Sequence, residues 1–306
     1  MKLKPFLILW AACMALLPAQ TLAKNPISVY VSILPQKYFV ERIAGEHARV
    51  QVLVKPGKSP STYSPSPDQI KELTTSDIFF RIGVPFENGF LHKINAISGD
   101  IQIVDTRKGI AMREMKFHDH GDDPHEKTDH NGSDHNETDK QDPTGKDPHI
   151  WMNPLLVKTQ ARTMAAALIS FDPENSRAYE QNMERFIRDL ETLHNHLTAT
   201  LVPFQGETIF VFHPVFGYFT DAYGLKQMAI ETMGKAPRGK QLSAIIKKAK
   251  VNKTRVLFVQ PQFDQHAAQK ISAAIKGRVV SIDPLAFDYL SNMESIAQAI
   301  GSNLAQ

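Results

Sequence analysis

Short apolar runs rich in β-branched residues alternate with helical patterns along most of this chain. In its first half the runs are bounded by proline, glycine or charged residues, and they predict strands over 27–34, 50–54, 77–82 and 101–104. Apolar residues at helical spacing lie between them, over 35–43 and 67–75. Strands that are apolar on both faces and alternate with helices form parallel sheets covered by helices on each side. The first half is therefore expected to be an α/β lobe.

The second half repeats this order of elements without repeating the sequence. Its apolar runs and helical patterns predict strands over 208–212, 227–230, 255–259 and 279–282, and helices over 242–250, 266–275 and 293–304. We expect this half to form a second lobe of the same class.

A long helical pattern separates the two halves. A first helix is expected from Pro154 to about Ser170, and one apolar stripe then continues for about six turns at three- and four-residue spacing, through Tyr179, Met183, Phe186, Leu190, Leu193, Leu197 and Leu201. At about 1.5 Å per residue this second helix is about 40 Å long, which exceeds one small domain. The sequence thus predicts an α/β fold of two parallel-sheet lobes, 24–172 and 203–306, joined by a long rigid helix over 173–202.

The first 23 residues predict a secretory signal peptide. Lys2 and Lys4 precede an apolar run over 6–17, which is too short to span a bilayer, and small residues before Lys24 fit signal peptidase, with cleavage after Ala23. Cleavage there would remove the single cysteine of the chain. The exported protein would then lack disulfides and thiolate ligands, so any metal site must use nitrogen and oxygen atoms.

An acidic segment over 118–146 contains five of the twelve histidines, at His118, His120, His125, His130 and His135. It has almost no apolar residue, so burial cannot offset the entropy of ordering it, and we expect a loop. Imidazoles among carboxylates suit zinc, and low-affinity metal capture is the hypothesis for these five residues. The alternative is a solvated linker in which the histidines are incidental. Basic residues elsewhere are scattered along amphipathic helices, which argues against nucleic-acid binding.

Three polar side chains lie at the ends of apolar segments near the expected carboxyl edges of the sheets, where open α/β sheets bind ligands. They are His149, which precedes Ile150 and Trp151, His213 after the strand over 208–212, and Asp283 after the strand over 279–282. Each also has an ordinary structural interpretation, as a turn histidine, a strand-end histidine and an Asx turn. Two lobes that face each other would bring the three side chains together.

Four ordered motifs give these residues a context. The stretches 56–67, 147–151, 213–219 and 283–285 resemble the ligand-bearing motifs of the periplasmic zinc-binding proteins that serve ABC-type metal importers. The resemblance implies two lobes with the ion between them, His149, His213 and Asp283 as ligands, and a periplasmic location. It implies zinc as the bound ion, with manganese less favoured because His213 stands where manganese-type members have a carboxylate. The implied partner is a membrane permease, and we expect the protein itself to be a monomer.

Two positions depart from the family pattern. Ser61 stands where the first motif usually has histidine, and Gln260 stands where the family often has glutamate, which would remove a charge close to the site. Three protein ligands leave a fourth position open to water, to the second oxygen of a bidentate Asp283, or to a loop histidine.

An open zinc site with two histidines and one carboxylate also describes a zinc-dependent hydrolase. The sequence contains no His-Glu-x-x-His stretch that could supply a general base, so we expect no enzyme activity and no catalytic residue. A metal-binding adhesion protein on the same scaffold is the other alternative, and no added module favours it.

Overall fold

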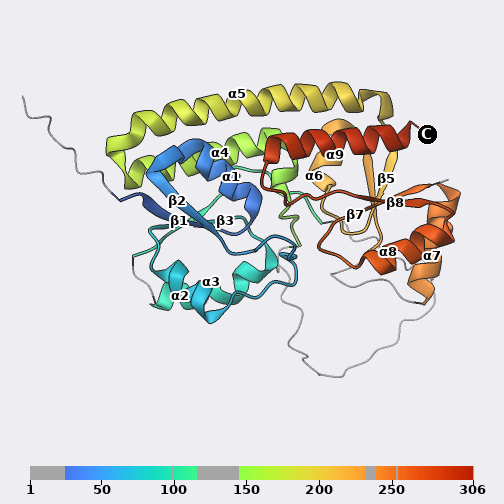
Figure 1. Cartoon of the computed structure of the whole chain (residues 1–306), viewed down its shortest axis with the longest axis horizontal. Helices are drawn as coiled ribbons and strands as arrows, with labels where there is room; N and C mark the ends of the chain where they lie inside the picture. Colours follow the sequence, from blue (N-terminus) through green and yellow to red (C-terminus); the bar gives the residue numbers. More distant parts are fainter. Residues whose placement is uncertain (1–24, 98–99, 116–144, 232–238, 253, 306) are drawn as a thin grey trace, which may run out of the picture.

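Two four-stranded parallel sheets form the centres of two lobes (Figure 1). The structure is a computed structural model that describes residues 25–97, 100–115, 145–231, 239–252 and 254–305. In the first sheet the order is β2-β1-β3-β4, with β1 Ile27–Val31, β2 Ala48–Val52, β3 Ile78–Arg81 and β4 Gln102–Asp105. The second sheet has the order β6-β5-β7-β8, with β5 Thr208–Val211, β6 Lys226–Ala229, β7 Val256–Val259 and β8 Arg278–Ser281. The predicted α/β class and the eight strands are confirmed.

Helices cover both faces of the first sheet. Figure 1 places α1 Leu34–Ala44 and α4 Pro154–Phe171 on one face, and α2 Pro67–Thr74 and α3 Pro85–Ile97 on the other. The starts of these helices follow local rules. Ser66 and Gln69 form a capping box before α2, and the Asn153 side chain accepts from the Leu155 N–H at the start of α4.

The second lobe has the same layers. Figure 1 places α9 Tyr289–Leu304 and α6 Gly217–Tyr223 on one face of the sheet, and α7 Lys240–Val251 and α8 Gln265–Ala274 on the other. The sequence reading missed α6, because its run of aromatic residues lacks the polar alternation of an amphipathic helix. Within the described residues, the remaining regular elements are four short 3₁₀ turns: η1 Gly45–His47, η2 Ile150–Met152, η3 Pro173–Asn175 and η4 Val202–Phe204.

The helix α5 Ser176–Leu201 has 26 residues and lies along both lobes (Figure 1). It packs against α1 and α4 of the first lobe and against α9 and α6 of the second. The predicted stripe is its buried face, except that Met183 is only partly buried. One apolar cluster continues from the first sheet through α5 into the second lobe. Because its packing is continuous, the helix holds the two lobes at a fixed separation.

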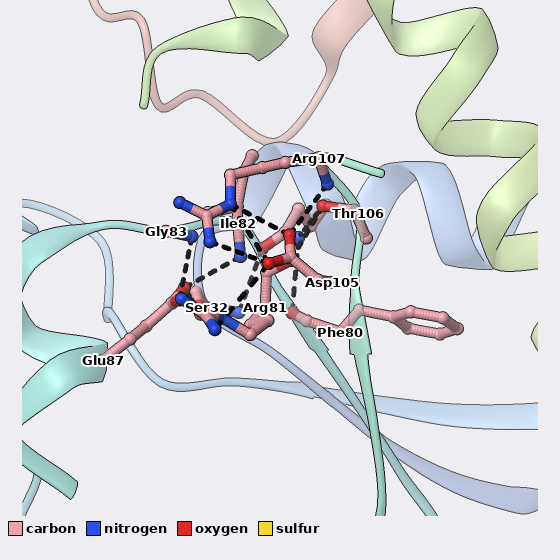
Figure 2. Close-up of polar contacts among 10 residues, drawn as sticks. Ser32, Phe80, Arg81, Ile82, Gly83, Glu87, Asp105, Thr106 and Arg107 are labelled. Atoms are coloured by element: carbon pink, nitrogen blue, oxygen red, sulfur yellow. Dashed lines mark hydrogen bonds and ion pairs between the residues drawn. The ribbon is translucent and has the colours of Figure 1, made fainter. Parts of the chain in front are cut away.

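A buried carboxylate holds the carboxyl edge of the first sheet (Figure 2). Glu87 is fully buried, and its carboxylate accepts from the backbone N–H groups of Ile82 at 2.9 Å and Gly83 at 2.8 Å. The Ser32 hydroxyl donates to it at 2.6 Å, and Arg81 Nε at 3.2 Å. Burial raises the pKa of Glu87, and these donors oppose that shift. The network fixes the chain after β3, so this lobe presents a rigid edge to the other.

The chain segments on either side of residues 116–144 pair with each other. Residues 113–115 and 145–147, here called the stem, are joined by an antiparallel bridge between Glu114 and Lys146. Met115 N–H donates to the Gly145 carbonyl at 2.9 Å, and Asp147 N–H donates to the Arg113 carbonyl at 2.9 Å. The stem therefore brings the ends of the histidine-rich segment together beside His149. Across the residues that the structure describes, no helix is both long and apolar enough to cross a bilayer.

Candidate metal centre

His149 lies at the start of η2 and is held by a carboxylate two residues earlier. Asp147 Oδ1 lies 2.7 Å from His149 Nδ1 and also accepts the His149 backbone N–H at 3.0 Å. The other oxygen of Asp147 accepts from Arg113 at 3.4 Å. His149 is only 6% exposed, and this burial lowers its pKa below the usual value although Asp147 acts in the opposite direction. The imidazole is therefore held neutral, which is the form that can bind a cation.

His213 lies just beyond β5 and has a similar arrangement. Its Nδ1 lies 3.0 Å from Glu231 Oε1, and the Glu231 side chain is only 2% exposed. The imidazole stacks on Phe263, with ring centroids 4.8 Å apart and planes 21° apart. Gln260 fixes the main chain, since its side chain accepts from the His213 N–H at 3.2 Å and donates to the His213 carbonyl at 3.1 Å. Ring and backbone of His213 are thus both fixed.

The two imidazoles come from different lobes and lie against each other. Their ring centroids are 5.3 Å apart and their planes are 83° apart. If both Nε2 atoms bind one ion at about 2.1 Å, with the tetrahedral angle of about 109° between them, the two imidazole centroids lie about 5.3 Å apart. Because each Nδ1 already contacts a carboxylate, the two Nε2 atoms are the ones left to bind. The separation of His149 and His213 therefore fits one small tetrahedral cation.

Asp283 lies near the pair through a shared loop. Its Oδ1 accepts from Gln262 Nε2 at 2.8 Å and from the Leu285 N–H at 2.9 Å. Gln262 precedes Phe263, the residue on which His213 stacks. Among the described residues, no three histidine, aspartate or glutamate side chains are already arranged to hold a metal ion. The structure brings the two histidines together, and it links Asp283 to the loop of Phe263 through Gln262, with Oδ1 of Asp283 occupied by two donors.

Ser61 and the five loop histidines are the other positions that the sequence analysis named. The Ser61 N–H donates to Ser59 Oγ at 3.3 Å, and the side chain is partly buried. In the part of the chain that the structure describes, Ser61 makes no hydrogen bond with His149, His213 or Asp283. The loop histidines His118, His120, His125, His130 and His135 lie outside the described residues.

Sequence reasoning missed the two carboxylates that hold the imidazoles. Asp147 could have been found, because an aspartate two residues before a histidine can form an Asx turn onto it. Glu231 lies 18 residues after His213, and no local pattern connects them. The expectation for Gln260 also needs refinement. Its amide pairs with the main chain of His213 in both directions, and an ionised glutamate could not donate to that carbonyl.

Two tyrosines and one tryptophan attach the His149 segment to the second lobe. The Tyr218 hydroxyl donates to the Asp147 carbonyl at 3.0 Å and accepts the Arg113 N–H at 3.0 Å. The Tyr289 hydroxyl donates to the Trp151 carbonyl at 2.7 Å, and Trp151 Nε1 donates to the Pro284 carbonyl at 2.9 Å. Burial raises the pKa of Tyr218 to about 12 and holds the pKa of Tyr289 well above its usual value, so both remain protonated donors. The backbone is thus held on both sides of His149.

Comparison with known proteins identifies a matching family. A family model described as "Zinc-uptake complex component A periplasmic" matches residues 29–303. The high-affinity zinc uptake system protein ZnuA of Haemophilus influenzae is 29% identical over 311 residues, covering 92% of this chain and 92% of its own.

Solved structures resemble the fold over most of its length. A crystal structure of a ZnuA deletion mutant with zinc bound has a TM-score of 0.79 and 34% identity, covering 91% of this chain and 98% of that one. The laminin-binding protein of Streptococcus agalactiae, described as bifunctional in adhesion and metal transport, has a TM-score of 0.77. It covers 92% of this chain and 100% of its own at 20% identity, and this likeness shows the shared fold alone.

Proposed function

The chain belongs to the family of periplasmic zinc-uptake components, and from that premise we propose that it chelates zinc in the periplasm and delivers it to the membrane permease of an ABC-type importer. The family consists of solute-binding components and not of enzymes. The proposed process is binding and release of the ion, with no bond made or broken in a substrate. Export through the signal peptide over 1–23, cleavage after Ala23 and a monomeric state are parts of the same proposal.

The separation of the two imidazoles is the observation that carries this proposal. The ring centroids of His149 and His213 are 5.3 Å apart, a spacing compatible with a shared tetrahedral cation, and each ring has its Nδ1 held by a carboxylate. Asp283 would bind as the third ligand. Its Oδ1 already accepts two hydrogen bonds, so the geometry favours binding through Oδ2 alone over a bidentate aspartate. Water would then take the fourth position.

Charge balance supports a divalent ion at this place. In their ionised forms the carboxylates of Asp147, Glu231 and Asp283 carry −3, and Arg113, which contacts both Asp147 and Asp221, carries +1. This excess of negative charge favours a cation, and a divalent ion offsets two of the charges. The offset reduces the cost of placing the ion away from bulk water. Nitrogen ligands favour zinc over manganese, which prefers oxygen.

The rival functions gain no support from the geometry. A hydrolase needs a general base beside the ion-bound water. The carboxylates in contact with the two imidazoles are Asp147 and Glu231, and both are engaged at the Nδ1 atoms, away from the Nε2 side of each ring. For the adhesion alternative, no contact in the described residues points to a matrix protein.

A calorimetric titration of the mature chain tests the proposal. Residues 24–306, freed of metal with a chelator, are titrated with zinc and separately with manganese. We expect one zinc ion bound per chain, more tightly than manganese. A chain that binds no zinc at micromolar concentration, or binds manganese more tightly, would refute the assignment.

A further inference from the structure

In each lobe a carboxylate contacts Nδ1 of the histidine, but the two carboxylates lie at different positions relative to their histidines. In the first lobe Asp147 holds His149 from two residues away, at 2.7 Å. In the second lobe Glu231 holds His213 from the end of a neighbouring strand, at 3.0 Å. A local turn accounts for the first pair but not for the second. Glu231 therefore needs an explanation of its own.

Backbone hydrogen bonds hold Glu231 beside His213. The hydrogen-bond ladder between β5 and β6 continues beyond β6, where the Ile230 N–H donates to the Val211 carbonyl at 3.0 Å and the Glu231 N–H to the Phe212 carbonyl at 2.9 Å. Glu231 is thereby fixed next to the residue that precedes His213. Its carboxylate is almost fully buried, which is costly for a charged group unless it interacts with a partner. The imidazole of His213 is such a partner.

We propose that Glu231 is the positioning residue of His213, and that it makes the site selective for cations that prefer nitrogen ligands. This inference rests on the proposed zinc-binding function. A carboxylate on Nδ1 favours the tautomer that carries its proton there, which leaves the Nε2 lone pair available to the ion. Stacking on Phe263 fixes the ring plane, so Glu231 and Phe263 together determine where Nε2 points.

The selectivity follows from the route by which Glu231 acts. A carboxylate that contacts only the imidazole affects the ion only through that ring. Its removal therefore lowers the affinity for a nitrogen-preferring ion such as zinc more than the affinity for an oxygen-preferring ion such as manganese. If Glu231 were instead a direct oxygen ligand, removing it would lower the affinity for manganese at least as much as the affinity for zinc. If it only stabilised the fold, both affinities would fall together. The ratio of the two affinities therefore separates the three roles.

The test uses the mature chain with Glu231→Leu, which removes the acceptor, and Glu231→Gln, which keeps an acceptor oxygen without the charge. Glu207→Gln is the matched control, because Glu207 lies exposed in the same lobe before β5. Zinc affinity is measured by competition with a chromophoric chelator, and manganese affinity by the electron paramagnetic resonance signal of the free ion. Nitrogen-15 spectra of the metal-free protein report the tautomer of His213.

For Glu231→Leu we expect zinc affinity to fall about 10- to 100-fold, and the ratio of zinc affinity to manganese affinity to fall at least about threefold. Glu231→Gln should lose less zinc affinity than Glu231→Leu, and Glu207→Gln should have the zinc and manganese affinities of the wild type. The Nδ1–H form of His213 should dominate in wild type and lose its dominance in Glu231→Leu. The inference is overturned if the ratio changes less than about threefold in both folded Glu231 variants, or if the tautomer is unchanged. A wild-type chain without a tight zinc site would instead overturn the proposed function.

Discussion

The two tyrosine hydroxyls that hold the backbone around His149 can be removed without changing the shape of the core. Tyr289→Phe deletes one buried hydrogen bond, to the Trp151 carbonyl at 2.7 Å. Tyr218→Phe deletes the bond to the Asp147 carbonyl and the bond from the Arg113 N–H, both at 3.0 Å, and a weaker contact with Met112 Sδ at 3.8 Å. A buried carbonyl that loses its donor costs about 1–3 kcal/mol, and an ordinary hydrogen bond contributes about 1 kcal/mol. We therefore expect Tyr289→Phe to lower the free energy of unfolding by about 1–2 kcal/mol, and Tyr218→Phe by about 2–3 kcal/mol.

These losses can be measured by thermal unfolding of the metal-free protein. For a chain of this size 1 kcal/mol corresponds to about 2–4 °C in melting temperature, so Tyr289→Phe should melt about 2–8 °C lower. Tyr63→Phe is the matched control, because the Tyr63 hydroxyl also donates at 2.7 Å, to Gln69, but is only partly buried. Water can replace that lost bond, so its effect should stay below about 0.5 kcal/mol.

The rise in melting temperature on adding zinc is a second measurement on the same variants. Saturating zinc raises the melting temperature by an amount that depends on its affinity. If the two hydroxyls hold His149 in place for the ion, this rise should be smaller in Tyr218→Phe and Tyr289→Phe than in wild type. The reasoning fails if both variants melt like Tyr63→Phe. It also fails in its functional part if the variants are less stable yet gain the full wild-type rise on adding zinc.

Four further changes test the site and the core. His149→Ala and His213→Ala should each weaken zinc binding by at least about 100-fold in calorimetry, since each removes half of the imidazole pair; retention of tight binding would exclude that residue as a ligand. Ser61→His should tighten zinc binding if position 61 can reach the ion, and an unchanged affinity would place the fourth ligand elsewhere. Deletion of residues 118–144, which keeps the stem intact, should leave one tight zinc site while slowing uptake when zinc is scarce; loss of the tight site in calorimetry would mean that the segment supplies an essential ligand. The fully buried amide of Gln160 makes no hydrogen bond to any residue that the structure describes, so Gln160→Leu should raise the free energy of unfolding by about 1–2 kcal/mol in a chemical denaturation, whereas a decrease would show that the amide is hydrogen-bonded to buried water.

The sequence predicted the regular elements well where periodicity alone determines them. Strands such as β7, whose four residues are all buried, and the long stripe of α5 follow from patterns of apolar residues. Ends of elements were less accurate. The first strand was expected to continue to Leu34, but it ends at Val31 because α1 begins at Leu34 with Pro35 in its first turn.

The candidate site was predictable only in part, because its members meet through tertiary contacts. His149 and His213 were proposed from their positions at the ends of apolar segments, and the structure places their rings edge to face. The roles of Glu231 and Phe263 depend on how β6 and the β7–α8 loop lie against β5, which no local pattern encodes. The proposed ligand role of Asp283 stays a prediction. The lobe boundaries at 172 and 203 also stay a proposal, since one apolar cluster runs through both lobes.

The stem has a consequence for how freely this chain can vary in length. The bridge between Glu114 and Lys146 closes the chain between them into a loop. The entropy of closing such a loop depends only logarithmically on its number of residues, so doubling that number costs about 0.6 kcal/mol. Shortening or extending the insertion therefore scarcely alters the thermodynamics of the two lobes. A fluorescent domain or an affinity peptide spliced between Met115 and Gly145 would be tolerated at little energetic expense. Such a graft would carry its signal next to Asp147, within two residues of a proposed ion ligand.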